Sequence, residues 1–137
     1  MRTLKRIVPV LLLACVFPAT GAFAADFGGW HPSASEVALL PRFCWKQFFG
    51  KKFSGPQFEI PRATCGVGTN HYCPALVLLN RANRTFGNQS LRRKYLRFAK
   101  KKVQYTLRWT EKYPACPIRD RAERMYQLID KELMQIR

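Results

Sequence analysis

Cys65, His71 and Cys73 are the residues whose types and spacing could do chemistry in this chain. Thiolates and an imidazole are ligands that zinc accepts, Cys116 could complete a set of four, and a Cys–His pair can also serve as nucleophile and base. Zinc sites, however, favour cysteines two to four residues apart, and neither such a pair nor the Cys-x-x-Cys of thiol oxidoreductases occurs here. We therefore expect no cofactor and no catalytic residue, and we keep Cys65, His71 and Cys73 only as the weaker, metal-binding alternative.

Residues 1–24 have the pattern of a secretory signal peptide. Arg2, Lys5 and Arg6 precede an apolar run over residues 7–17, which is too short to span a bilayer, and Ala22-Phe23-Ala24 fits the small-x-small cleavage rule. Removal of this segment takes three positive charges from the formal +16, which leaves about +13. We expect one exported domain over residues 25–137.

A lipid anchor on Cys15 is the alternative to cleavage after Ala24. Leu12-Leu13-Ala14-Cys15 is similar to a bacterial lipobox. The residues after Cys15 remain apolar up to Ala25, where a lipoprotein has a polar tether. A cleaved signal peptide and a periplasmic or secreted protein are therefore favoured over a lipoprotein.

Export changes what the remaining cysteines do, because an oxidising compartment converts thiols to disulfides. An even set remains, which indicates two disulfides with three possible pairings: Cys44, Cys65, Cys73 and Cys116. If the two central helices form an antiparallel hairpin, Cys65 and Cys116 fall at the same end of the bundle. This geometry favours Cys65–Cys116 with Cys44–Cys73, and His71 then packs or caps at a helix start.

The hydrophobic spacing predicts an all-α fold, a small disulfide-stapled bundle of about four helices made of helical hairpins, and strand-like alternation is missing from the sequence. Residues 25–69 read as loop-rich with one helix. The capping box Ser33-Ala34-Ser35-Glu36 begins that helix, and Val37, Leu40, Cys44 and Phe48 share one face. Pro41 either kinks the helix or restarts it. A long loop, tied by Cys65, is expected from Gly50 to Thr69.

Residues 70–137 predict three helices. The first has Asn70 as its N-cap, an apolar stripe that reaches Phe86, and an end at Gly87-Asn88. The second spans Gln89 to Lys112 and is the longest. The third opens at Pro117 and continues to the C-terminus.

Basicity is the strongest chemical signal of the sequence. Residues 91–108 contain no acid and eight basic residues, seven of which form the predicted basic face: Arg92, Arg93, Lys94, Arg97, Lys100, Lys101 and Arg108. A solvated face normally mixes charges of both signs, so this basic face indicates an anionic partner. The aromatic residues of the same helix are expected in the core, and no nucleic-acid-binding module is recognisable, so nucleic acid is not the expected partner.

Four segments carry a resemblance to a known group: LPRFC (40–44), NHYCPALVLLNRAN (70–83), RRKYLRFAKKKVQYTLRW (92–109) and CPIRDRAERMYQL (116–128). They resemble the opening of exported bacterial proteins in which a cysteine-bearing helical segment precedes tetratricopeptide-type repeats. The resemblance implies a tetratricopeptide-like helical scaffold with an interaction role, in a Gram-negative bacterium, and no enzymatic activity. No array follows Arg137 in this sequence, so the concave peptide-binding surface of such arrays is not expected.

We expect an exported, strongly basic binding or scaffold protein that contacts a protein partner or an anionic component of the cell envelope. The alternative is a basic effector that makes peripheral contact with anionic membranes or binds envelope polymers. A Cys/His metal protein or an enzyme is less favoured. The sequence does not specify the oligomeric state.

Overall fold

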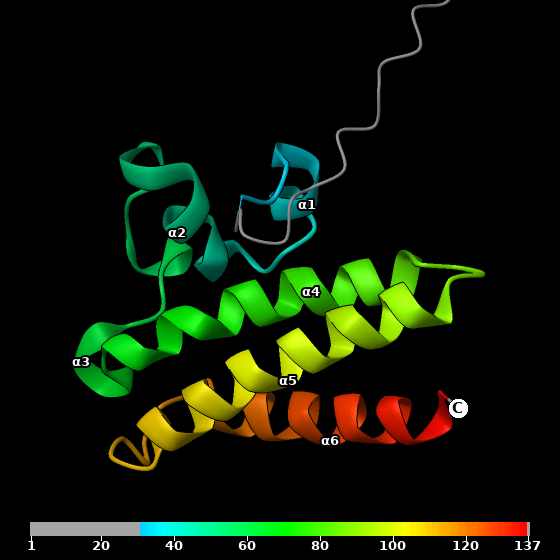
Figure 1. Cartoon of the computed structure of the whole chain (residues 1–137). Coiled ribbons are helices and arrows are strands. Elements are labelled where there is room, and N and C mark those ends of the chain that lie inside the picture. The colour runs from blue at the N-terminus through cyan, green and yellow to red at the C-terminus, as the bar shows by residue number, and fades with distance from the viewer. Residues whose placement is uncertain (1–30, 137) are drawn as a thin grey trace, which may run out of the picture.

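Three long helices form the body of the protein in the computed structural model, which describes residues 31–136. They are α4 (Tyr72–Arg84), α5 (Gln89–Thr110) and α6 (Arg119–Gln135), and α5 packs against both α4 and α6 (Figure 1). The described residues contain no strand and include two disulfides, which confirms the prediction of an all-α, disulfide-stapled bundle. The expected signal peptide and Cys15 lie outside the described residues.

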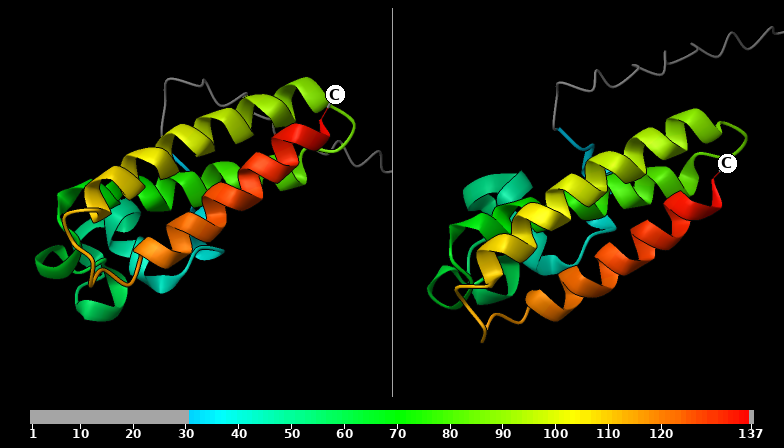
Figure 2. Two further views of the ribbon diagram at one scale, coloured as in Figure 1. Left: turned by 90° about the horizontal axis from the view of Figure 1, so that it is seen from below. Right: turned by 60° about the horizontal axis from the view of Figure 1, so that its bottom comes forward.

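The amphipathic spacing explains how α5 and α6 pack. Leu96, Ala99 and Val103 follow one another at helical spacing along α5 and are fully buried. Ala122 and Ile129, which are seven residues apart on α6, are also fully buried. Helix α4 is apolar on more than one side, so it is the most buried of the three. Consecutive long helices run antiparallel, so the start of α4, the end of α5 and the start of α6 meet at one end of the body (Figure 2).

Short elements replace the single helix that was expected before residue 50. The capping box is confirmed: the Ser33 hydroxyl accepts from the Glu36 amide, and the Glu36 carboxylate accepts from the Ser33 amide. Helix α1 ends at Ala38, and it does not continue through Pro41, which has no amide hydrogen to donate into a helix. A new helical element begins directly after Pro41, which is one of the two alternatives predicted. The elements of this region are α1 (Ala34–Ala38), η1 (Arg42–Cys44) and α2 (Trp45–Phe49).

The long loop expected from Gly50 to Thr69 is only partly irregular. It contains four short helical elements: η2 (Gly50–Lys52), η3 (Pro56–Phe58), α3 (Arg62–Cys65) and η4 (Val67–His71). The predicted N-cap Asn70 lies inside η4, so α4 begins later, at Tyr72. A tight 3-10 turn takes the place of the expected cap because η4 packs on α5.

The predicted helix ends need four further corrections. Helix α4 ends at Arg84, so Phe86 does not extend its buried stripe and is instead 87% exposed. Asn88 does not close α4; its side chain accepts from the Leu91 amide and caps α5. Helix α6 begins at Arg119 rather than at Pro117, and α5 ends at Thr110 rather than at Lys112.

Candidate functional site

The sulfur atoms form two disulfides at the end of the body where α4 begins. Cys44 bonds to Cys73 with 5.6 Å between the Cα atoms, and Cys65 bonds to Cys116 with 4.7 Å. These are the pairs favoured from the sequence. All four cysteines are buried, and disulfides of this kind are consistent with an extracellular or periplasmic location.

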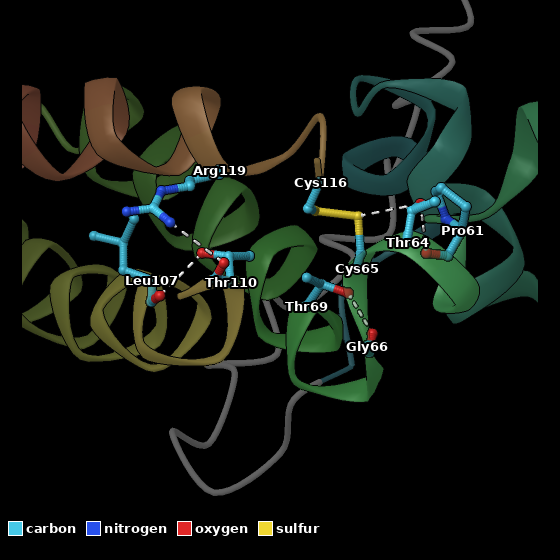
Figure 3. Close-up of a disulfide and its surroundings, with 9 residues drawn as sticks. All are labelled: Pro61, Thr64, Cys65, Gly66, Thr69, Leu107, Thr110, Cys116 and Arg119. Atoms are coloured by element: carbon cyan, nitrogen blue, oxygen red, sulfur yellow. Dashed lines mark hydrogen bonds between the residues drawn. A yellow bond between two sulfur atoms is a disulfide. The ribbon is translucent and has the colours of Figure 1, made fainter. Parts of the chain in front are cut away.

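The Cys65–Cys116 disulfide joins α3 to the segment before α6, and polar side chains close the surrounding turns (Figure 3). The hydroxyl of Thr69, which is buried, donates to the Gly66 carbonyl at 3.0 Å. The hydroxyl of Thr110 donates to the Leu107 carbonyl at 2.9 Å, at the last turn of α5. These bonds satisfy polar groups that would otherwise be buried unpaired, which is the role of a structural corner.

His71 lies beside these disulfides as a packed ring. Its centroid is 4.1 Å from that of Tyr105, and its Nδ1 atom is buried without a hydrogen-bond partner among the described residues. Burial lowers the pKa of His71, and the nearby positive charge of Lys102 lowers it further. Its side chain makes no cap at the start of α4. The arrangement therefore keeps the imidazole neutral and packed against α5.

The structure does not assemble the metal-binding alternative. Cys65 and Cys73 are each consumed in a different disulfide, so neither can offer a thiolate. Among residues 31–136, no group of three His, Cys, Asp or Glu side chains is placed to hold a metal ion. Of the three metal ligands predicted, Cys65, His71 and Cys73, only the imidazole of His71 therefore remains as a possible ligand.

The seven cations predicted on the basic face divide into two sets. Four of them are exposed and lie on one side of α5, where we name them the basic strip: Lys94, Arg97, Lys101 and Arg108. Their spacing of three, four and seven residues keeps them in line over about 21 Å of helix. A hollow along α5 is lined by the first three strip residues and by side chains that include Arg93, Phe98, Lys100 and Gln104. The strip is thus a row of exposed cations along α5.

The other three cations, Arg92, Arg93 and Lys100, are partly buried and attach α5 to α6. Arg92 pairs with Glu132 and Lys100 pairs with Asp130, in both cases across the two helices. Arg93 donates to the carbonyl of Ile136 at 2.5 Å. These side chains therefore contribute to packing, and the surface available to a partner is narrower than the sequence predicted.

Most acids of the described chain serve internal ion pairs. Besides the two pairs between α5 and α6, Glu36 pairs with Arg81 at 2.6 Å, Glu59 with Lys46 at 2.5 Å, and Glu123 with Arg119 at 3.2 Å. The hydrogen bond from Arg81 lowers the pKa of Glu36 to about 2. Most of the acids are thus paired with cations outside the strip, and α5 itself contains no acid.

Sequence reasoning missed a cluster of four rings, which we name the aromatic lobe: Trp45, Phe49, Phe53 and Phe58. Their centroids are 5.2 to 6.1 Å apart in the five contacts that they make, and each ring is half-buried. The signal in the sequence is the density of aromatic residues between Phe43 and Phe58. Because Gly and Pro interrupt this stretch, no periodicity marked it.

Within residues 31–136, no helix is both long enough and apolar enough to cross a membrane. No protein-family profile, no curated protein and no solved structure matches the chain. The functional argument therefore depends on the residues and their geometry alone.

Proposed function

We propose that the chain is an exported, strongly basic helical scaffold that binds an anionic partner of the cell envelope through the basic strip on α5. The partner is an acidic protein or an acidic envelope polymer, in the periplasm or outside the cell. The single observation that carries the proposal is an exposed row of cations on a helix that contains no acid.

Folding alone does not favour this row. Arg97 and Lys101 are four residues apart, as are Arg93 and Arg97, and like charges at this spacing destabilise a helix by a few tenths of a kcal/mol per pair. The ion pairs of Glu36, Glu59, Asp130 and Glu132 use cations outside the strip. Arg97, Lys101 and Arg108 are exposed to ions from solution. An acidic partner would offset the repulsion along the strip and would associate faster at low salt.

The scaffold part of the proposal is supported by the two buried disulfides. One disulfide fixes η1 against α4 and the other fixes α3 against the segment before α6, so the body that carries the strip is cross-linked at one end. A preorganised binding surface loses less conformational entropy when a partner binds. The disulfides also support the proposed location, because such bonds persist outside the cytoplasm.

Fluorescence anisotropy with two labelled probes, poly-L-glutamate and a sulfated polysaccharide, tests the proposal. The triple substitution Arg97→Gln, Lys101→Gln and Arg108→Gln should weaken binding roughly 30-fold at low salt, because each exposed ion pair contributes about 0.5–1 kcal/mol. The matched control, Arg84→Gln, Arg124→Gln and Lys131→Gln, removes the same charge from exposed positions on α4 and α6 and should change the affinity by about threefold or less. The probe that binds more tightly distinguishes an acidic protein from a polymer.

Equal losses in the two triple variants would show that binding follows net charge alone and would count against a site on α5. Far-UV circular dichroism of each variant controls for folding. The salt dependence of the affinity gives a second readout. A dependence that is less steep in the strip variant, and unchanged in the control, would assign the ionic contacts to the strip.

A further inference from the structure

The aromatic lobe is a second surface, separate from the basic strip. Its four rings contact one another, whereas the main core and the residues packed on it come from other positions. Helix α4 lies between the lobe region at α2 and helix α5 (Figures 1 and 2). A helix therefore separates the lobe region from the middle of α5.

Cations surround the rings of the lobe. The segment from residue 42 to residue 62 has Glu59 as its only acid, against five basic residues: Arg42, Lys46, Lys51, Lys52 and Arg62. Lys46 pairs with Glu59, and both side chains are 39% exposed. Lys51 and Lys52 are exposed and lie between Phe49 and Phe53 in the chain. The lobe thus combines aromatic rings with a net positive charge.

This combination matches the chemistry of an anionic membrane surface. Aromatic rings prefer the headgroup region of a bilayer, and basic residues beside them are attracted to anionic lipids. A peptide partner would instead need a groove lined by the rings. The hollow that adjoins the lobe is lined by Phe43, Ile60 and Thr69, among others, and by none of the four rings.

We infer that the aromatic lobe docks the protein onto the surface of a bilayer that contains anionic lipid. The lobe is fastened to the body, because the Cys44–Cys73 disulfide holds its start and Gln47 donates to the Asn70 carbonyl at 2.6 Å. The rings enter the headgroup region while Lys51 and Lys52 contact lipid phosphates. The basic strip lies on a different element, α5, so the inference gives one protein a membrane contact and a separate contact with an anionic partner.

Vesicle binding with the disulfide-intact protein tests this inference. Vesicles of phosphatidylcholine are compared with vesicles in which part of the lipid is replaced by phosphatidylglycerol, and a third set carries brominated acyl chains. We expect binding only to the anionic vesicles, with quenching of tryptophan fluorescence by the bromines. The substitution Trp45→Phe keeps an aromatic ring and should remove this quenching. Quenching that persists in Trp45→Phe, or binding without any quenching, would overturn the assignment to the lobe.

Two matched double variants separate this inference from the proposed function. Lys51→Gln with Lys52→Gln should weaken vesicle binding roughly 30-fold, since each cation at an anionic surface contributes about a factor of five. Arg97→Gln with Lys101→Gln removes the same charge and should change it by about twofold or less, because charges beyond the Debye length of ~8 Å are screened. Equal effects, or no vesicle binding at all, would refute a docking lobe. Failure of the proposed function would appear instead in the polymer assay with the strip variants.

Discussion

A single methyl group added at Gly68 would test how η4 packs on α5. A Cβ at this position would lie under 3.0 Å from three ring atoms of Trp109, namely Cγ, Cδ1 and Cδ2. Cγ is attached directly to the Trp109 Cβ, so a rotation of the indole cannot easily move it away. The backbone of Gly68 lies outside the positive-φ region, so the effect of Gly68→Ala is steric and not conformational.

The expected loss of stability follows from the size of this overlap. Overpacking a well-packed site costs about 1–3 kcal/mol, and this overlap places the effect near the upper limit, at about 3 kcal/mol. Either η4 must separate from α5, or Trp109 must leave its ring contact with Tyr105, whose centroid is 6.3 Å away. At about 4 °C per kcal/mol for a domain of this size, we expect the Tm to fall by roughly 10 °C.

Chemical denaturation under non-reducing conditions, followed by far-UV circular dichroism, measures the effect. Gly87→Ala is the matched control, because Gly87 has a φ of 75° and open space around it, so it should lose only about 1 kcal/mol from backbone strain. Trp109→Leu should relieve the overlap, so the double variant Gly68→Ala/Trp109→Leu should lose less stability than the sum of the two single variants. A Gly68→Ala protein as stable as the wild type, or strict additivity in the double variant, would refute the packing described here.

Three further outcomes are expected. Replacing either pair of disulfide-bonded cysteines by serine should lower the free energy of unfolding by about 4 kcal/mol, given the sequence separations of 29 and 51 residues; thermal melts of each variant measure this. Glu36→Gln should remove about 1–2 kcal/mol near neutral pH. In the wild type this contribution is present above pH 4.5 and is lost as the pH falls toward about 2, because the folded pKa lies below the ordinary value; urea titrations at several pH values detect the difference. The folded pKa of His71 is also lowered, so its contribution is full above pH 6.5 and is lost as the pH falls through the folded value; an NMR titration of the imidazole that gave a pKa above 6.5 would contradict its packed environment.

Periodicity predicted the long helices, because each buries a continuous stripe whose spacing is visible in the sequence. The capping box was equally visible, since Ser33 and Glu36 interact within one turn. The short elements between Gly50 and Thr69 could not be predicted in this way. They owe their shape to a disulfide at Cys65 and to the fit of Gly68 against Trp109, and both are contacts between residues far apart in the chain.

The candidate site likewise combines features that a local sequence pattern predicts with features that depend on contacts between distant residues. The sequence identified the cations of α5 but could not tell which of them face solvent. Arg92 and Lys100 are taken by Glu132 and Asp130, which lie at least 30 residues further along the chain. Only the packing of α6 on α5 separates these cations from Arg97 and its neighbours. The aromatic lobe was missed because only Trp45 and Phe49 share a helix, α2, whereas Phe53 and Phe58 reach them through turns.

The two ends of the body are held by different chemistry, and this predicts that they can be loosened separately. Disulfides fix the end where α4 begins, whereas Arg92 and Arg93 fix the end of α6 through Glu132 and the Ile136 carbonyl. Salt screens a partly exposed ion pair that contributes about 0.5–1 kcal/mol, so high salt should speed hydrogen exchange in the last turn of α6 by about two- to fivefold. A reductant should instead speed exchange in α3 and η4, where the cross-link is lost. If both treatments opened the same amides, the bundle would unfold as one unit, and the division into a covalent end and an ionic end would be wrong.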